Sequence, residues 1–363
     1  RVTKAALLMA YCRKLQRTSA AMKCWNTEMS ASDLNRSVGP KNTFGQKSGE
    51  FELISRYFAP LAGPGGLGLT DDAALLTPRA GCQIVLTTDA IVSGVHFLPE
   101  DPGDDLAWKL LGVNLSDLAA MGAEPVGYLI TTAWPRDLPE SWIALFAKGL
   151  GMAQESFGIS LLGGDTVSTA GPLTLSLTGL GEVPQNEALR RNGAQVNDLI
   201  YVSGRIGDAG VGLRVLRDHK LVDSDDERRF VVERYRRPRP RLALGAALRG
   251  VASACIDVSD GLVADLEHLA EQSFVKMKVH LDSVPVTPLA KMLGGPTGAI
   301  VAGDDYELLF TAPPDRQDKI FGLAQDLSVP VNAIGHVEDG SGVEIVDSTG
   351  KAVSLISPGY RHF

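Results

Sequence analysis

Six short aspartate-rich motifs constrain the fold of this chain more than any other feature. Each places aspartates beside Gly, Ser or Thr, next to an apolar segment that we expect to form a strand or helix. The motifs occupy residues 70–74, 87–89, 114–123, 163–166, 256–261 and 303–308. Carboxylate oxygens are preferred ligands of Mg²⁺, which usually keeps waters and shares its shell with substrate phosphates. The pattern therefore favours an enzyme whose fold gathers several element ends and binds nucleotide phosphates through metal ions.

The size and charge of the chain narrow the class of protein further. Its 363 residues, 44% of them hydrophobic, are enough for two domains. Residues 1–48 carry nine Lys and Arg against two Asp and Glu, whereas the rest carries 26 against 41. An acidic body argues against a nucleic-acid-binding surface. No apolar run approaches the about 20 residues that cross a bilayer, so we expect small-molecule substrates and neither a nucleic-acid nor a membrane partner.

The first 48 residues differ from the rest in composition. They are basic, rich in Ser, Thr and Asn, and lack a long apolar segment. We interpret them as an extension outside the catalytic fold; a targeting peptide and an upstream extension both remain open. The four cysteines, at positions 12, 24, 82 and 255, have spacings that suit neither a zinc site nor a disulfide framework. Free thiols are typical of a reducing compartment, so the expected location is the cytoplasm.

Apolar periodicity predicts a first α/β unit. We expect helices at 50–58, 104–121 and 139–157, and strands at 83–88, 126–133, 159–162 and 173–183. The strand at 83–88 is expected to place Asp89 at its C-terminal end. The Gly/Pro-rich segment 59–70 is interpreted as a flexible connector, because no strand precedes it as a dinucleotide-binding loop would require.

A polar stretch at 184–197 predicts a domain boundary near residue 185. Beyond it we expect strands at 199–203, 254–258 and near 275–281, 298–302, 307–312, 331–337 and 343–347, with helices at 207–217, 226–235, 242–249 and 262–271. The basic, proline-broken segment 236–241 is interpreted as a solvated connection. The predicted organisation is an extension at 1–48, a first domain at 49–185 and a second at 186–363.

Each acidic motif taken alone has a structural alternative. Asn114 and Asp117 share a helix face, yet a solvent-facing polar pair explains them as well. Asp260 suits the N-cap of the following helix, whereas Asp257 ends an apolar segment and needs another explanation. The glycines at 163–164 fit either a tight turn or a close approach to a ligand. Six such motifs together are hard to attribute to caps and turns, which favours a shared metal and phosphate site.

Familiar phosphate-binding and nucleophile motifs are missing from the chain. The sequence contains no G-x-x-x-x-G-K-[ST] loop, no protein-kinase signature and no G-x-S-x-G elbow. Phosphates must therefore be held in another way. His96 has no histidine near it in sequence, which leaves a binding role and a packing role equally open.

Read in order, the motifs resemble those of thiamine-monophosphate kinases, in the aminoimidazole ribonucleotide synthetase-like superfamily. The resemblance is carried by 49–54, 71–76, 87–97, 113–123, 163–166, 256–262 and 305–308, and runs from about Gly49 to the end of the chain. It implies a two-domain α/β fold with mixed sheets, made of an N-terminal dimerising domain and a C-terminal α/β domain. It also implies a homodimer that uses ATP and Mg²⁺ to phosphorylate thiamine phosphate to thiamine diphosphate.

The same resemblance implies roles for single residues. The metal ligands would be Asp72, Thr87, Thr88, Asp89, Asp117, Asp165, Asp257 and Asp260. ATP would be contacted by Gly164, Asp165, Arg191 and Ser259, and thiamine phosphate by His96, Asp304 and Tyr360. Two positions depart from the family pattern, since Thr70 stands where the family has Gly and Asp304 where it has Glu.

The implied reaction needs no acid, base or nucleophile from the protein. The acceptor is a phosphate monoester whose second pKa is about 6, so it is largely dianionic at neutral pH. Several Mg²⁺ ions would offset the charge of two polyanions and orient a direct in-line transfer. The alternatives are another ATP-dependent enzyme of the superfamily, such as a purine-pathway ligase or a selenophosphate synthetase-like enzyme, and a non-catalytic nucleotide-binding relative.

Overall fold

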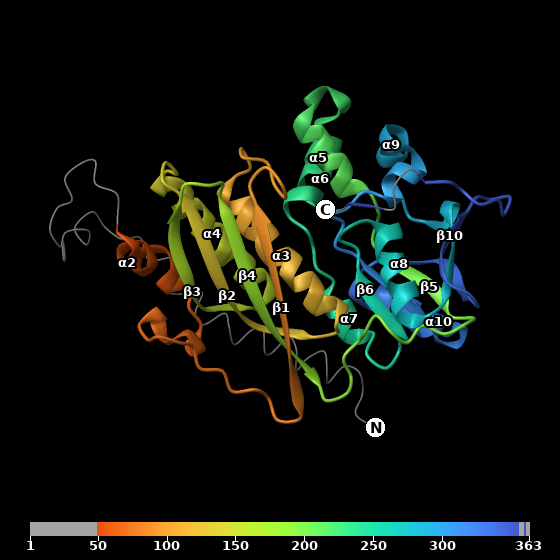
Figure 1. The fold of residues 1–363 in the computed structure, drawn as a ribbon, viewed down its shortest axis with the longest axis horizontal. Coiled ribbons are helices and arrows are strands. Elements are labelled where there is room, and N and C mark those ends of the chain that lie inside the picture. The colour runs from red at the N-terminus through yellow and green to blue at the C-terminus, as the bar shows by residue number, and fades with distance from the viewer. Residues whose placement is uncertain (1–48, 356–358, 361–363) are drawn as a thin grey trace. The chain divides into compact units, whose positions relative to one another are not determined.

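Two β-sheets organise the chain (Figure 1). The computed structural model describes residues 49–355 and 359–360, so the prediction for 1–48 lies outside the described residues. Sheet I has the strand order β1-β4-β2-β3, with β1 (Cys82–Val92), β2 (Glu124–Pro135), β3 (Ser160–Thr169) and β4 (Thr174–Pro184). Sheet II has the order β10-β7-β9-β5-β8-β6, with β5 (Leu199–Ser203), β6 (Ala254–Asp257), β7 (Lys276–His280), β8 (Leu308–Ala312), β9 (Val331–Glu338) and β10 (Gly342–Val346). The mixed α/β class predicted from the sequence is confirmed.

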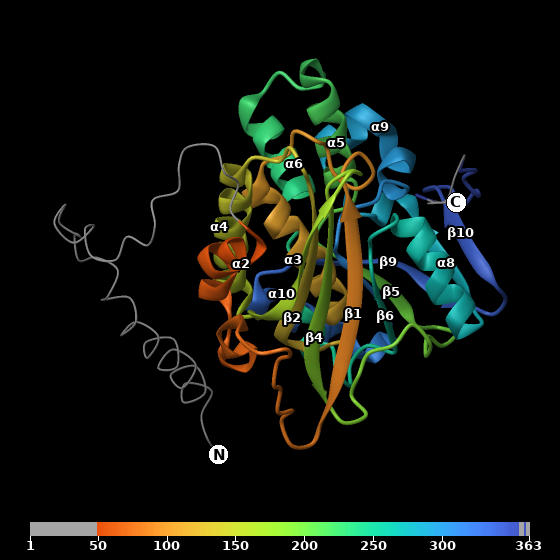
Figure 2. The same cartoon turned by 60° about the vertical axis from the view of Figure 1, so that its left-hand side comes forward.

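Sheet I is covered by helices on one face. β1, β4 and β2 lie side by side in antiparallel pairs, and β3 joins β2 in parallel (Figure 2). The helices α3 (Gly103–Ala120) and α4 (Glu140–Phe157) pack on it around a core that includes Leu110, Tyr128 and Phe146. On the other face Leu86 and Val167 are exposed. Sheet I therefore has an open face with apolar side chains on it.

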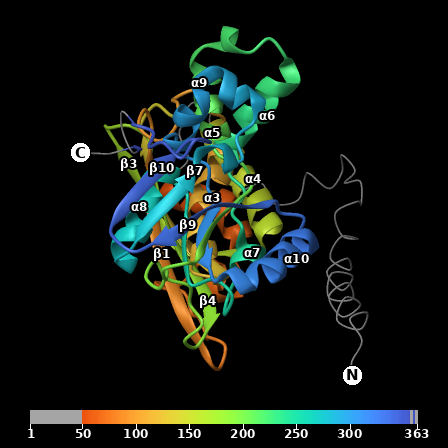
Figure 3. The same cartoon turned by 90° about the vertical axis from the view of Figure 1, so that its right-hand side faces the viewer.

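Sheet II is covered on both faces. Figure 3 shows α8 (Leu262–Ser273) and α10 (Gln317–Leu327) on opposite sides of it. Ile200 and Val202 of β5 belong to the core under α8, whereas Tyr201 between them belongs to the core under α10 and α7 (Leu242–Ala247). A strand buried on both faces reads as a continuous apolar run. A separate helical cluster contains α5 (Asp208–Arg217), α6 (Asp225–Arg236) and α9 (Pro288–Ile300).

Helix α3 is buried nearly all round because both halves of the chain pack against it. It contacts β1 and β4 in sheet I, and α6, α7 and β6 in the second half. Gly112 allows the segment between α6 and α7 to approach as well, since a Cβ there would stand 2.8 Å from Cγ of Pro238. Asp104 and Asp105 occupy the first turn, where the helix dipole favours acids. Among the described helices, none combines the length and apolar character needed to cross a membrane.

Most predicted elements are confirmed, and the differences are local. The helix expected at 50–58 is divided into α2 (Glu50–Leu53) and a π-helical turn at Ile54–Phe58, and Phe51 is 83% exposed. The strand expected at 298–302 was wrong, because those residues lie at the end of α9 and beyond it. Helices α9 and α10 were not predicted. β1 continues past Asp89 to Val92, so Asp89 lies within the strand and not at its end.

The Gly/Pro-rich segment 59–70 was wrongly interpreted as a flexible connector. It forms two 3₁₀ turns, Ala59–Leu61 and Pro64–Leu69, and the second of them packs on β3. Gly63 N donates a hydrogen bond to the Leu161 carbonyl at 2.8 Å. A Cβ on Gly66 would stand 2.9 Å from the Leu162 carbonyl oxygen. The glycines therefore serve close packing of backbone on backbone.

The basic segment 236–241 was wrongly interpreted as solvated. Arg236 pairs with Asp101 at 2.7 Å, and Arg237 pairs with Asp104 at 3.1 Å, both just before or within the first turn of α3. At its other end, Arg241 donates from Nε at 2.6 Å to the fully buried carboxylate of Glu307. Acids from distant parts of the sequence therefore pair with the arginines of this segment and hold it along α3.

Candidate functional site

The structure distributes the predicted site residues between two cavities. The first, of about 580 Å³, is lined by Asp89, His96, Asp117, Arg191, Asp257, Ser259, Asp260, Asp304 and Tyr360. We call it the acid pocket. The second, of about 650 Å³, is lined by Asp72, Gly164 and Asp165, and we call it the edge pocket. Thr87 lines a smaller neighbouring cavity together with Asp117, Arg191 and Asp257.

Strand β1 and helix α3 meet through polar side chains at the acid pocket. The backbone N–H of Asp89 donates to Oδ1 of Asn114 at 3.0 Å, and the Thr87 hydroxyl donates to the Asp117 carboxylate. Asn114 is fully buried, and its Nδ2 donates to the Leu110 carbonyl at 2.9 Å. The alternative of a solvent-facing pair at Asn114 and Asp117 is therefore wrong. The three-residue spacing turns both toward β1.

Thr88 lies apart from the other residues of its motif. Its hydroxyl donates to the Leu177 carbonyl at 3.0 Å, and Thr178 Oγ1 lies 3.3 Å from it. Because side chains alternate along a strand, Thr88 faces the open side of sheet I while Thr87 and Asp89 face α3. The structure thus does not bring the Thr88 hydroxyl together with the acid pocket.

The turn between β6 and α8 contributes two more carboxylates. Asp257 ends β6 and is buried, and its Oδ2 accepts a hydrogen bond from the Ser116 hydroxyl of α3 at 2.7 Å. Asp260 lines the pocket three residues later. α3 and β6 therefore join the two halves of the chain at the floor of the acid pocket.

Asp260 is not the N-cap of α8 that the sequence suggested. Gly261, with φ of 117°, occupies that position and makes no side-chain cap. The buried Asp265 carboxylate instead accepts from the backbone N–H of Ser259 at 3.0 Å and of Asp260 at 3.2 Å. Asp265 thus holds the turn from inside the helix, and the Asp260 side chain is not used as a cap.

Burial, with repulsion from neighbouring carboxylates added to it, raises the pKa values of three clustered acids. Burial, together with Asp117 and Asp260, raises the pKa of Asp89 to about 6. Burial, together with Asp117, raises the pKa of Asp257 to about 7. Burial, with Asp257 and Asp260 beside it, raises the pKa of Asp265 to about 8. A cation bound among these acids would offset their repulsion and favour their ionised forms.

The donor set fits a hard cation that shares its ligands with a substrate. The acids offer oxygen atoms only, which suits Mg²⁺. Within residues 49–355 and 359–360, no three Asp, Glu, His or Cys side chains are grouped closely enough to hold a metal ion. An ion bound here would take the rest of its shell from phosphate and water, as Mg²⁺ commonly does.

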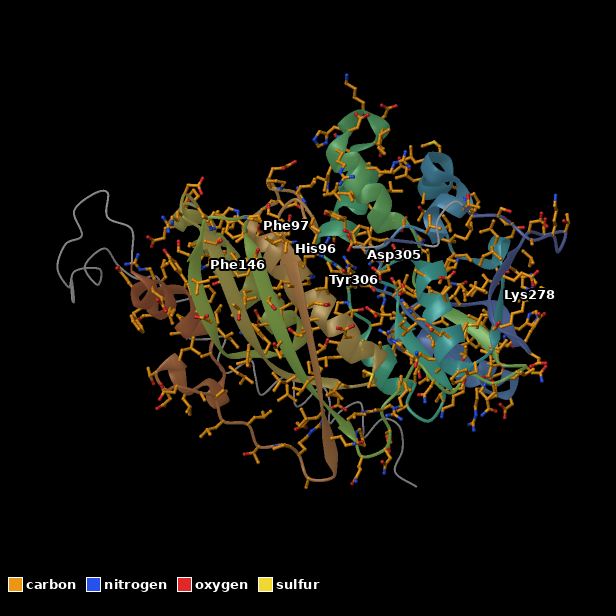
Figure 4. All side chains as sticks on the ribbon, viewed as in Figure 1. His96, Phe97, Phe146, Lys278, Asp305 and Tyr306 are labelled. Carbon is orange, nitrogen blue, oxygen red and sulfur yellow. The ribbon has the colours of Figure 1, made fainter. Side chains whose placement is uncertain are left out.

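The residues expected to meet thiamine phosphate also line the acid pocket. In Figure 4, His96 and Tyr306 lie between the two sheets. His96 Nδ1 accepts from Val92 N at 3.1 Å. Asp304, shorter than the family's Glu, still reaches Lys109 Nζ at 3.2 Å. Tyr360 is 47% exposed at the pocket and its backbone N–H donates to the Asp260 carbonyl at 3.0 Å.

Sequence reasoning missed several residues around the acid pocket. Arg217 of α5 and Tyr235 of α6 line it, although their helices looked like ordinary surface helices. Lys109 was also missed, yet it had a signal: it is a lone cation within the apolar run 106–113 of α3. Its side chain is 3% exposed.

The edge pocket lies beside β3, the edge strand of sheet I opposite β1. β3 runs straight through Gly163, Gly164 and Asp165, so these glycines do not form a tight turn. A Cβ on Gly164 would stand 1.9 Å from the Ile130 carbonyl oxygen, which only glycine avoids. Because β1 and β3 are opposite edges of a four-stranded sheet, three strand spacings or roughly 14 Å separate them. One chain therefore does not bring Asp165 to the acid pocket.

Asp72 reaches the same edge pocket from the segment after Pro64–Leu69. It is exposed and lines the cavity with Gly164 and Asp165. Thr70, which replaces the family's Gly, has φ of −108°, a conformation that any residue adopts. The replacement therefore adds no backbone strain at position 70.

Comparisons with known proteins show what the chain is similar to. The model for the N-terminal domain of AIR synthase related proteins matches residues 70–183, and that for the C-terminal domain matches 195–348. A thiamine-monophosphate kinase of Caulobacter vibrioides is 42% identical over 81% of this chain and 85% of its own length. That of Escherichia coli K12 is 38% identical over 87% of this chain and 98% of its own.

Solved structures show the same likeness. The crystal structure of thiamine-monophosphate kinase from Stenotrophomonas maltophilia is 43% identical, with a TM-score of 0.73 over 78% of this chain and 91% of that one. A structure described as AaThiL complexed with AMPPCP and TMP is 31% identical, with a TM-score of 0.70 over 88% of this chain and all of that one. The hydrogenase maturation protein HypE of E. coli, at 20% identity and a TM-score of 0.70, shares the fold.

Proposed function

Because the chain belongs to the thiamine-monophosphate kinase family, we propose that its acid pocket is where the γ-phosphoryl group of ATP passes to thiamine phosphate. The enzyme catalyses the ATP-dependent phosphorylation of thiamine phosphate to thiamine diphosphate. The observation that carries the proposal is the convergence of acids from β1, α3 and the β6–α8 turn on one cavity. A structure of a relative described with both AMPPCP and TMP supports it.

Mg²⁺ would be held by the carboxylates that repel one another in the acid pocket. We assign Asp89, Asp117, Asp257 and Asp260 as ligands there, with Thr87 orienting the Asp117 carboxylate. Bound ions would offset the charge of the two phosphates and stabilise the loose transition state. Thr88 would act through its backbone alone, because its hydroxyl faces the other way.

The two substrates would meet different walls of the pocket. We assign Arg191 and Ser259 to ATP, which a cation and a hydroxyl beside the acids suit. His96, Asp304 and Tyr360 would receive thiamine phosphate. Tyr360 offers an exposed aromatic face to the cationic thiazolium or the pyrimidine.

Transfer would be direct, without a phosphorylated protein. Thiamine phosphate already carries the nucleophilic oxygens as an anion near neutral pH. The acceptor oxygen of thiamine phosphate is already ionised, so no hydroxyl has to be deprotonated. We therefore give the acids of the pocket no acid, base or nucleophilic role. Capture of labelled phosphate on the chain in a pulse–chase experiment would contradict direct transfer.

A homodimer would complete the site. We propose that two chains pack through the open faces of their sheets I, where Leu86 is 65%, Leu129 39% and Val167 45% exposed. Asp72, Gly164 and Asp165 of one chain would then supply the ligands and ATP contacts that the acid pocket of the other lacks. Light scattering should give twice the mass of one chain, and a monomer with full activity would contradict this arrangement.

The remaining expectations are also proposals. We place the domain boundary near residue 185, supported by the end of sheet I at Pro184 and the start of sheet II at Leu199. A cytoplasmic location is supported by the free thiols of Cys82 and Cys255.

The test of the function is ADP release from ATP and Mg²⁺ with thiamine phosphate as acceptor. Thiamine and aminoimidazole precursors serve as controls. Turnover with thiamine phosphate alone, with thiamine diphosphate as product, supports the proposal. Turnover with a control acceptor only would keep the acid pocket and move the activity to another enzyme of the superfamily.

A further inference from the structure

We propose that Lys109 is a positioning residue for the acceptor, a role that rests on the proposed function. Lys109 lies on α3 with its side chain 3% exposed. Its Nζ stands 3.2 Å from Asp304 Oδ2 and 3.7 Å from the centroid of the Tyr235 ring. A buried ammonium needs such compensation, and here both partners line the acid pocket.

Tyr235 connects this cation to a second wall of the acid pocket. Its hydroxyl donates to the His96 carbonyl at 3.2 Å. Lys109 therefore contacts Asp304 directly. It is connected to the segment that contains His96 through the ring of Tyr235. Three elements distant in sequence, α3, α6 and the segment before β8, meet at this one ammonium group. Two of the three residues assigned to thiamine phosphate are thus connected to it, Asp304 directly and His96 through Tyr235.

The Asp304 backbone is strained, which makes its anchoring consequential. Asp304 has φ of 70° and Tyr306 φ of 50°, both left-handed conformations of residues other than glycine. Such conformations persist where surrounding contacts over-determine them. Tyr306 donates from its hydroxyl to Asp304 Oδ1 at 3.1 Å. Lys109 and Tyr306 thus fix one carboxylate oxygen each.

This arrangement indicates what Asp304 can recognise. A carboxylate has about four acceptor positions, and the protein uses one on each oxygen. The remaining acceptor positions of the Asp304 carboxylate suit a ligand with N–H donors or positive charge. The aminopyrimidine and thiazolium rings of the acceptor have these. Lys109 would place this carboxylate for the acceptor without touching the reacting phosphates. Its effect should therefore fall on the acceptor and spare ATP.

The experiment compares Lys109→Met with Lys148→Met, a change of an exposed lysine on α4. Lys109→Met keeps an unbranched side chain that is one atom shorter and removes its charge. We expect KM and the calorimetric Kd for thiamine phosphate to rise roughly 10- to 100-fold, as loss of a charged hydrogen bond and misplacement of a binding group allow. KM for ATP and all constants of Lys148→Met should stay within about twofold.

A double variant separates positioning from a general structural role. If Lys109 acts through Asp304, then Lys109→Met should add little to the KM of Asp304→Asn, since the two changes remove one interaction. Independent, multiplying effects, or an equal rise of both KM values, would overturn the proposal. An unchanged KM for thiamine phosphate in Lys109→Met would do so as well.

A second variant covers failure of Lys109→Met to fold. Tyr235→Leu leaves the lysine and removes the ring beneath it, so a selective rise in the KM for thiamine phosphate is again expected. No selective rise there would overturn the proposal. Absence of thiamine phosphate turnover in the unaltered enzyme would instead remove the proposed function, which keeps the two failures distinguishable.

Discussion

Two arginines in the segment 236–241 allow a direct test of how burial sets the strength of an ion pair. Arg241, 17% exposed, binds the fully buried Glu307 through Nε at 2.6 Å and Nη2 at 2.5 Å. Arg239, 62% exposed, binds Glu233, which is 46% exposed. The two arginines are two residues apart and have the same partner type. The variants Arg241→Met and Arg239→Met therefore differ mainly in the burial of the pair that is lost.

The expected magnitudes follow from the contacts that each variant loses. Removing one partner of a buried pair costs about 3–5 kcal/mol of unfolding free energy. Glu307 keeps Arg234 at 2.9 Å and the Ser203 hydroxyl at 2.6 Å, so we expect about 2–3 kcal/mol for Arg241→Met. Loss of an exposed pair costs below about 1 kcal/mol. The two variants should thus differ by about 2 kcal/mol.

The assay is urea unfolding at equal protein concentration, followed by tryptophan fluorescence and by circular dichroism. With an m-value of about 2–3 kcal/mol per molar, the urea midpoint of Arg241→Met should lie about 1 M lower. The four tryptophans, at positions 25, 108, 134 and 142, all lie before residue 185. Agreement of both probes therefore shows that the two halves unfold together. Glu307→Gln in the Arg241→Met background should recover part of the loss, because it removes the uncompensated charge.

The reasoning is refuted if Arg241→Met and Arg239→Met lower the free energy of unfolding equally. It is also refuted if Glu307→Gln changes the free energy of unfolding equally in the unaltered chain and in Arg241→Met. Arg241 and Glu307 would then be uncoupled. Either result would show that burial does not strengthen the pair of Arg241 and Glu307.

Three further predictions concern the acid pocket. Asp260→Asn should lower kcat at least about 100-fold with the fold retained by circular dichroism, and near-normal turnover at saturating Mg²⁺ would contradict its assignment as a ligand. Tyr360→Ala should raise KM for thiamine phosphate about tenfold, and a defect confined to ATP would contradict its placement. In Mg²⁺-free buffer, the Asp257 contribution to stability is fully present below its unfolded pKa near 3.9 and is lost as pH rises to its folded pKa of about 7. Asp257→Asn should remove this contribution and raise Tm at pH 8 relative to the unaltered chain. If Tm changes equally with pH in both proteins, the raised pKa does not belong to Asp257.

Much of the fold and of the acid pocket could be predicted because their signals are local. Apolar periodicity located most strands and helices, and the motif around Asp257 identified a strand that ends in acids. The three-residue spacing of Asn114 and Asp117 fixed their common helix face. What the spacing did not contain was the partner of that face, so the buried contact with β1 could not be distinguished from a solvated pair.

The rest depended on contacts between distant parts of the chain. Arg241 and Glu307 are 66 residues apart, and nothing near either one shows that they meet. The order β1-β4-β2-β3 likewise sends Asp165 away from Asp89, although the two motifs look alike in sequence. Lys109 was the one missed residue with a local signal, because a cation inside an apolar helix requires a compensating partner.

The placement of β1 and β3 at opposite edges of sheet I has a genetic consequence. If two chains share each site, a chain with Asp165→Asn and a chain with Asp257→Asn are defective in different halves of it. A mixed pair of these chains has one site with both changes and one with neither. Coexpression of two inactive alleles should therefore restore activity, whereas alleles altered at Asp257 and Asp260, in the same half, should not complement each other.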